Sequence, residues 1–336
     1  AGADAYNTAI GYYAGYAVST GTLNTLIGGL AGDALTTGSS NTAVGYESFT
    51  AETTGDYNIA IGREALRLST LANKSIGIGV GALNSQAQAV KTDTYNIAVG
   101  HFAGTAVTTG VQNVLIGGST GDALTSGGSN TAIGYRALTT EDTGSYNIAI
   151  GTYALENQDA GDAYNVAIGY FAGKAVTTGV QNTLIGAQSG DAITSGIRNT
   201  VLGYNALSSD TTGNGSVAIG SQTLTSQNFL LGEATYNTAV GDEAGNDVTD
   251  GQENTFIGAL AGDAVTTADG NTVLGAYALG AETTGGKNTA VGRAALAAQN
   301  AGADAYNVAV GYNTGIAVST GTANTLIGSL AGDALT

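Results

Sequence analysis

Residues 7–11 read Asn7-Thr8-Ala9-Ile10-Gly11, and this short motif decides the fold. It returns at residues 24–28 as Asn-Thr-Leu-Ile-Gly and at residues 41–45 as Asn-Thr-Ala-Val-Gly. A nearly fixed period of this kind is typical of repeat proteins. We count nineteen copies, whose glycines stand at positions 11, 28, 45, 62, 79, 100, 117, 134, 151, 169, 186, 203, 220, 241, 258, 275, 292, 311 and 328.

The step between copies is regular, with a few exceptions. The motif glycine usually returns at every seventeenth position along the chain. Four steps are longer, and the two longest are those that end at Gly100 and Gly241. The other two long steps end at Gly169 and Gly311.

The column four residues before each motif glycine is almost entirely asparagine, with Ser75 and Ser216 as the two exceptions. If the copies stack, each asparagine lies over the one in the next copy, and their amides can hydrogen-bond along the stack. We therefore predict a structural asparagine ladder made of Asn7, Asn24, Asn41, Asn58, Asn96, Asn113, Asn130, Asn147, Asn165, Asn182, Asn199, Asn237, Asn254, Asn271, Asn288, Asn307 and Asn324.

A larger period groups the copies into blocks of about 70 residues, which is a second level of internal repetition. Four residues after the motif glycine stands either a second glycine, as at Gly15, or a bulky apolar residue, as at Phe49 and Leu66. Two copies of the first kind are followed by two of the second, or by three in the first block. The blocks start at Gly11, Gly100, Gly169, Gly241 and Gly311.

The residue types within the motif predict a short strand. β-branched residues dominate its second and fourth positions, and the closing glycine permits a sharp corner. We expect a second short strand after the corner, for example at Ala17-Val18, before a Thr-Gly or Ser-Gly turn leads to the next asparagine. A circuit of about 17 residues is too short for a strand–helix unit, which takes roughly 30. The sequence therefore predicts an all-β fold, a parallel β-solenoid or β-roll of about 19 coils, over residues 1–336 as one repeat domain.

Each predicted coil has little material for a core. Strand alternation puts Thr8 and Ile10 on one side and Ala9 on the other, and we expect the aliphatic residue before the glycine to form a continuous apolar spine. Burial of one large aliphatic side chain contributes only about 1.5–3 kcal/mol. Ordering the backbone costs about 1–2 kcal/mol per residue. Two arrangements meet this constraint: a narrow single-chain solenoid with alanines packed between two sheets, or three chains that share one core.

Composition narrows the class of protein. The chain has 54 glycines in 336 residues, no Pro, Cys, Met or Trp, and a net charge of −17. Because the chain has no cysteine, it has no disulfide framework and no thiolate metal site. The absence of proline is consistent with strands in which every backbone N–H donates a hydrogen bond. Nine cations in an acidic chain make a poor surface for nucleic acid, and no apolar run is long enough to span a membrane. Because no Met is present and the chain stops within a coil, we expect a fragment of a longer array.

The motifs resemble a known group of proteins. Residues 130–138 (Asn-Thr-Ala-Ile-Gly-Tyr-Arg-Ala-Leu) and 165–173 (Asn-Val-Ala-Ile-Gly-Tyr-Phe-Ala-Gly) are similar to the repeat regions of phage and bacterial tail-fibre-type proteins, which often end in an intramolecular chaperone domain. They more distantly resemble the β-roll heads of trimeric autotransporter adhesins. The resemblance implies an extracellular, cell-surface or virion fibre that is often homotrimeric.

Few residues suggest chemistry. His101 stands in a column that is tyrosine in other copies, and no Ser and Asp are marked as its triad partners. An aspartate recurs in the second copy of each block, but four coils, roughly 19 Å, separate its occurrences. These aspartates cannot share a calcium ion, whose ligands lie at about 2.3–2.6 Å. We predict no catalytic residue, cofactor or dedicated metal site, with adventitious calcium as the one ion to expect. The aspartates are Asp33, Asp122, Asp191, Asp263 and Asp333.

These features favour a structural module, the stalk or shaft of a surface or virion fibre, that has no enzymatic activity and self-associates as a homotrimer or end to end. The alternative is an adhesin that binds surface glycans or a receptor through its rows of tyrosine. A third hypothesis is ice binding by the threonine column, although residues such as Ile59 and Val114 interrupt that column.

Overall fold

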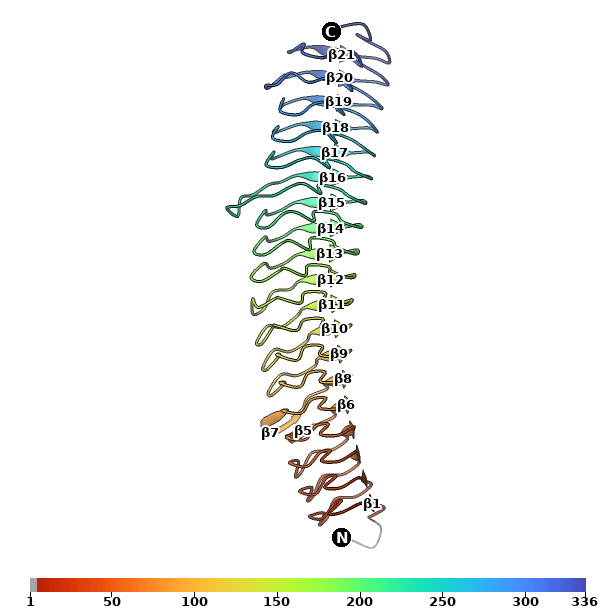
Figure 1. Cartoon of the computed structure of the whole chain (residues 1–336), viewed down its shortest axis with the longest axis vertical. Helices are drawn as coiled ribbons and strands as arrows, with labels where there is room; N and C mark the ends of the chain where they lie inside the picture. The colour runs from red at the N-terminus through yellow and green to blue at the C-terminus, as the bar shows by residue number, and fades with distance from the viewer. Residues whose placement is uncertain (1–4) are drawn as a thin grey trace. The chain divides into compact units, whose positions relative to one another are not determined.

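The computed structural model describes residues 5–336, and over this range the fold is an all-β parallel solenoid without helices. By its internal contacts the chain divides into two compact units, one ending at Asn165 and the other running from Val166 to Thr336. In each unit every coil contributes one short strand to a parallel sheet (Figure 1). The nineteen strands of this kind confirm the predicted fold class, and their positions confirm the predicted repeat spacing.

The strands coincide with the sequence motif. In the first unit they are β1 (Thr8–Ile10), β2 (Thr25–Ile27), β3 (Thr42–Val44), β4 (Ile59–Ile61), β6 (Ile76–Ile78), β8 (Ile97–Val99), β9 (Val114–Ile116), β10 (Thr131–Ile133) and β11 (Ile148–Ile150). In the second unit they are β12 (Val166–Ile168), β13 (Thr183–Ile185), β14 (Thr200–Leu202), β15 (Val217–Ile219), β16 (Thr238–Val240), β17 (Thr255–Ile257), β18 (Thr272–Leu274), β19 (Thr289–Val291), β20 (Val308–Val310) and β21 (Thr325–Ile327).

Neighbouring strands pair in register, so each residue lies beside its equivalent in the next coil. Between β1 and β2, for example, Thr8 is opposite Thr25 and Ile10 is opposite Ile27. In-register pairing is what a strict repeat should give, because any slip would move the middle residue to the opposite face.

The core of each unit is built from the middle residue of each strand. Ala43, Ala60, Leu115 and Val201 occupy this position and are fully buried. Further rows come from the alanine three residues after the motif glycine and from residues such as Leu66 at four residues after it. Each coil thus encloses a narrow core of its own, as in the single-chain arrangement, and alanines let its two sides approach closely.

The expectation that the aliphatic residue before the glycine forms the core is wrong. Both outer residues of each strand point away from the coil interior and are at least partly exposed. Ile61, for instance, is 37% exposed and Leu274 is 46% exposed. The reason is the strand alternation itself: only one of the two faces can point inward, and the middle residue occupies that face, whether it is small, as Ala43, or large, as Leu115.

The expected second strand at Ala17-Val18 is also wrong. There the chain forms turns in which N–H groups bond alternately within the coil and to the next coil. Ala14 N donates to Gly11 O (3.3 Å), Gly15 N donates to Ala31 O (2.9 Å), and Tyr16 N donates to Tyr13 O (3.2 Å). Left-handed residues, at φ 55° for Tyr13 and 62° for Gly15, break the extended geometry that a strand needs.

The motif glycine is required by both conformation and space. Gly28 has φ +136°, and a Cβ placed on it would lie 2.4 Å from the carbonyl oxygen of Gly45 in the next coil. A side chain at this corner would therefore push neighbouring coils apart.

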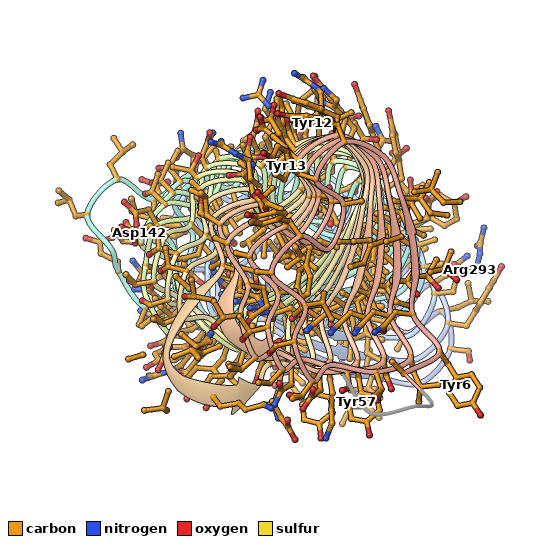
Figure 2. All side chains as sticks on the ribbon, turned by 90° about the horizontal axis from the view of Figure 1, so that it is seen from below. Tyr6, Tyr12, Tyr13, Tyr57, Asp142 and Arg293 are labelled. Atoms are coloured by element: carbon orange, nitrogen blue, oxygen red, sulfur yellow. The ribbon has the colours of Figure 1, made fainter. Side chains whose placement is uncertain are left out.

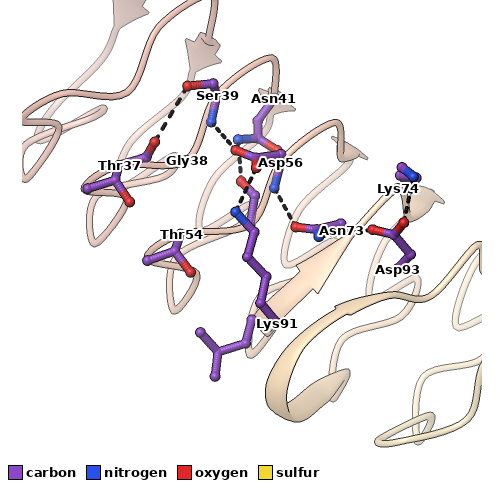
Figure 3. Close-up of polar contacts among 12 residues, drawn as sticks. Thr37, Gly38, Ser39, Asn41, Thr54, Asp56, Asn73, Lys74, Lys91 and Asp93 are labelled. Atoms are coloured by element: carbon purple, nitrogen blue, oxygen red, sulfur yellow. Dashed lines mark hydrogen bonds and ion pairs between the residues drawn. The ribbon is translucent and has the colours of Figure 1, made fainter.

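The long coils place their extra residues outside the main sheet. In the longest coil of the first unit the extra residues form β7 (Ala87–Asp93), which pairs in parallel with β5 (Thr70–Asn73). Figure 3 shows this insertion beside its neighbours, where Lys91 Nζ lies 2.6 Å from Asp56 Oδ2 and Lys74 Nζ lies 2.6 Å from Asp93 Oδ2. The insertion therefore adds surface contacts without altering the stacking of the motif strands.

Candidate functional site

The predicted ladder asparagines lie inside the coils and bond to one another along the stack. Asn24 is fully buried. Its backbone N–H donates to Asn7 Oδ1 (2.9 Å), and its Nδ2 donates both to Asn7 Oδ1 (3.2 Å) and to Gly38 O (2.9 Å). The same pattern repeats at Asn41 and Asn58. Each side chain thus satisfies the backbone groups of two coils at the point where the strand begins.

Buried glutamines bridge the two gaps in this ladder. Gln86 Nε2 donates to Ser75 Oγ (2.6 Å), and its Oε1 accepts from Asn96 Nδ2 (3.2 Å). Gln227 likewise bridges Ser216 and Asn237 (2.8 and 2.9 Å). The neighbouring strands stay in register across these steps, so the glutamine supplies the amide contact that the shorter serine side chain lacks.

Four buried carboxylates form a feature that the motif analysis missed. They stand seven residues after the motif glycine, one per block, and are Glu52, Glu141, Asp210 and Glu282. The signal was available in the sequence, because this column is otherwise apolar or holds Ser69 or the glutamines. It is invisible to a search for the five-residue motif alone.

Backbone N–H groups, not cations, hold these carboxylates. Glu52 Oε1 accepts from the N–H groups of residues 53, 54 and 55 at 2.8–3.0 Å and from Leu71 N at 3.1 Å. Its Oε2 accepts from Ala72 N and Ser69 Oγ. In Asp210, burial outweighs its hydrogen bonds and raises the pKa of the carboxyl above its ordinary value. Such a nest of amides can replace a counter-ion for a buried anion.

The outer face of each main sheet presents two parallel columns of Thr, Val, Ile and Leu. These are the first and third residues of the motif strands, and in-register pairing keeps them in line. The third residue is 46% exposed at Leu202 and 38% exposed at Ile257. Each unit therefore carries a flat, uncharged strip that its own chain does not cover.

Tyrosine columns border this strip on both sides. Figure 2 places Tyr12 and Tyr13 at one edge of the first unit and Tyr6 and Tyr57 at another, with their rings pointing outward. Tyr57 is 61% exposed. The rings of Tyr146 and Tyr164 stack at 5.2 Å with an interplanar angle of 4°. Exposed aromatic rows of this kind offer flat surfaces to a ligand or to another chain.

The recurring aspartates and His101 lie apart from any catalytic arrangement that the described residues show. Burial raises the pKa values of Asp33, Asp122, Asp191 and Asp263, with backbone hydrogen bonds opposing the shift. The raised pKa values show that burial disfavours the charged form of these carboxyls. His101 is exposed and packs against Phe102, with ring centroids 4.1 Å apart.

Among the described residues, one acidic cluster brings three carboxylates together. Oxygens of Glu141, Asp142 and Asp159 lie within 4.8 Å of one another. The buried Glu141 already accepts hydrogen bonds from Gly144 N, Gln158 Nε2 and Ala160 N. The other two acids are exposed, so the cluster amounts to two surface carboxylates beside a satisfied one.

The fold and these surfaces define the class of protein, a parallel β-solenoid built from a short, regular repeat. The sequence matches no protein-family model and no curated protein at a significant level. Within the described range, no helix has the length and apolarity needed to cross a bilayer.

Proposed function

We propose that this chain is a structural module of an extracellular fibre, on a cell surface or a virion, without enzymatic activity. The observation that carries the proposal is the uncharged Thr/Val/Ile/Leu strip on the outer face of each main sheet. The chain has a net charge of −17, yet no coil places a charged residue on this strip. Burial of its half-exposed aliphatic side chains favours association with another surface. The resemblance of the motif to tail-fibre-type repeats supports the same reading.

Self-association is part of the proposal, either as a homotrimer that packs through this strip or end to end through the terminal coils. Threonine beside aliphatic residues makes a flat surface on which strands of another copy can pack, and the tyrosine columns can extend the contact at its rim. A fibre gains from such an arrangement because a narrow core gives each chain little stability of its own.

Charge placed on the strip tests this proposal. The double variant Ile61→Lys and Ile116→Lys should lower the molar mass measured by light scattering from that of an oligomer to that of one chain. Lys at Tyr57 and Tyr95, at the rim, serves as the matched control and should lower the mass less. A wild-type protein of one-chain mass at all concentrations tested would contradict self-association.

The tyrosine columns favour a second candidate, an adhesin that binds surface glycans. Exposure of 61% at Tyr57 and 56% at Tyr204 leaves ring faces on which sugar rings can stack. A glycan-array signal that Tyr→Ala changes abolish would support this function. Ice binding stays a third candidate, and a thermal-hysteresis assay tests it.

A further inference from the structure

Four coils are longer than the others. In three of them a side chain from the preceding coil covers the surface next to the inserted residues. In the first, Lys74 Nζ bonds Asp93 Oδ2 and Tyr95 Oη (2.6 and 3.0 Å) and lies 4.9 Å from the centre of the Tyr95 ring. Lys287, Asp304 and Tyr306 repeat the arrangement in the second unit. In the third coil of this kind, Tyr146 and Tyr164 stack on each other.

The fourth long coil lacks such a covering side chain. Gly215 stands at the position of Lys74, Ala234 at the position of Asp93, and Tyr236 at the position of Tyr95. A cavity of about 190 Å³ results, lined by these three residues together with Arg198 and Asn214. The Tyr236 ring is 64% exposed, since no lysine covers it.

Arg198 at this cavity differs from the other cations of the chain. The chain has nine, all within the described range, and each of the others has an ion pair or an aromatic ring beside it. Among the described residues, the Arg198 side chain bonds only to Gln181 Oε1, through Nε at 3.2 Å. In a chain with 26 acidic residues, a guanidinium with neither an ion pair nor a cation–π contact is a feature that a bound anion would explain.

The rest of the cavity is fixed in place and polar at one side. Asn214 Oδ1 accepts from Ile197 N (2.7 Å), and its Nδ2 donates to Gly232 O (2.6 Å). Its backbone N–H donates to Glu233 O (3.0 Å). These bonds tie the insertion to the coil below it and leave the second Nδ2 hydrogen for a ligand.

We propose that this cavity binds one pyranose ring that carries a carboxylate, such as a uronic acid residue of a glycan. An aromatic face suits the apolar C–H face of a sugar, and the planar guanidinium fork matches a carboxylate with two parallel hydrogen bonds. Asn214 supplies a donor for a hydroxyl group. The volume is below the range of about 300–1,000 Å³ typical of drug-sized pockets, which fits a single ring. The site does not depend on the fibre function.

Saturation-transfer NMR on the full chain tests the proposal, with methyl glucuronide and methyl glucoside as probes. The glucuronide should give signals and bind at least about tenfold more tightly than the glucoside, because a charge-assisted pair is lost with the latter. Gly215→Lys should abolish the signals by refilling the cavity as Lys74 does. The backbone tolerates this change, since Lys74 and Lys287 adopt φ 57° and 61° at the same position. Arg198→Gln should weaken binding about tenfold or more.

Gly270→Lys is the matched control, because Gly270 holds the same place in its coil, with φ +68°, and does not line the cavity. This variant should bind as the wild type does. Absence of any signal, or signals that survive Gly215→Lys unchanged, would overturn the site. Equal binding of glucoside and glucuronide would overturn the assignment to a carboxylate-bearing sugar.

Discussion

The longest coil of the first unit and that of the second accommodate an insertion of the same length differently. In the first, the added segment forms β7, which pairs with β5 of the preceding coil, and its residues make ion pairs through Lys74 and Lys91. In the second, the added segment is a loop with a single bridge between Asn214 and Ala234. At the tip of this loop Leu230 and Leu231 are 73% and 85% exposed.

The interiors of the two coils are nevertheless almost the same. Both replace the ladder asparagine by serine, and both use a buried glutamine to reach the next asparagine. This difference indicates that the inward-facing columns constrain the repeat. The outward-facing segment between them can form a paired strand, stack its tyrosines or form an open loop, and the main sheet stays the same. Predictions on the two coils can therefore separate interior from surface contributions.

The largest effect is expected from removal of the bridging glutamines. Gln227→Leu keeps the volume but removes one hydrogen bond each from Ser216, Asn237 and the carboxyl of Asp210, whereas Gln86→Leu removes one each from Ser75 and Asn96. At about 0.5–1.5 kcal/mol for each neutral hydrogen bond and about 1.5–3 kcal/mol for the one to the Asp210 carboxyl, Gln227→Leu should destabilise by roughly 2.5–6 kcal/mol and Gln86→Leu by roughly 1–3 kcal/mol. Urea unfolding followed by circular dichroism measures both.

Equal losses in the two variants would show that the extra bond to Asp210 contributes nothing. Gln222→Leu provides a control in the second unit, because this glutamine is partly exposed and has a left-handed backbone that other residues share. Its stability should change by less than about 0.5 kcal/mol.

The sequence predicted the interior better than the surface, and the reason is physical. In-register stacking makes each column see the same environment in every coil, so a five-residue motif identified the strands, their parallel order and the asparagines. The direction of the aliphatic residue was misjudged because alternation fixes only relative sides, and Ala9 or Ile10 could equally have pointed inward.

The candidate sites were harder to predict because they are departures from the repeat. Glu52 and its equivalents occur once per block, and their role depends on backbone N–H groups that no side-chain pattern reveals. The cavity at Gly215 arises from what is missing there relative to Lys74, and it becomes visible only when the long coils are aligned in space.

A smaller effect is expected on the pH dependence of stability. The folded-state pKa of Asp210 is raised above its ordinary value of 3.8 because the carboxyl is buried. Folding then favours its protonated form, so its contribution to stability is greatest below pH 3.8 and is lost as pH rises through the folded-state pKa. Each unit of pKa difference corresponds to about 1.4 kcal/mol.

Urea midpoints of wild type and Asp210→Asn, measured from pH 3.5 to 7, check this. The variant should lose less stability than the wild type as pH rises, and the slope is the readout because the substitution also alters hydrogen bonds. The four other aspartates with raised pKa values contribute equally to both curves and cancel. Parallel curves would contradict the assignment to Asp210.

The smallest effect on stability is expected from the surface pair that distinguishes the first coil. The hydrogen bond from Lys74 lowers the pKa of the Asp93 carboxyl, and the pair lies in solvent, with side chains 37% and 43% exposed. Its stabilisation is present above the ordinary aspartate pKa and disappears as pH falls through the lowered value, and salt weakens it further.

Lys74→Gly, which copies the second coil, should therefore leave the urea midpoint almost unchanged while it raises the Asp93 pKa toward 3.8, as followed by carboxyl-carbon NMR. The same substitution at Lys287 should act in the same way on Asp304, whose pKa is also lowered by its lysine. A large drop in the midpoint would show that the ion pair, and not the buried glutamine beneath it, anchors the insertion.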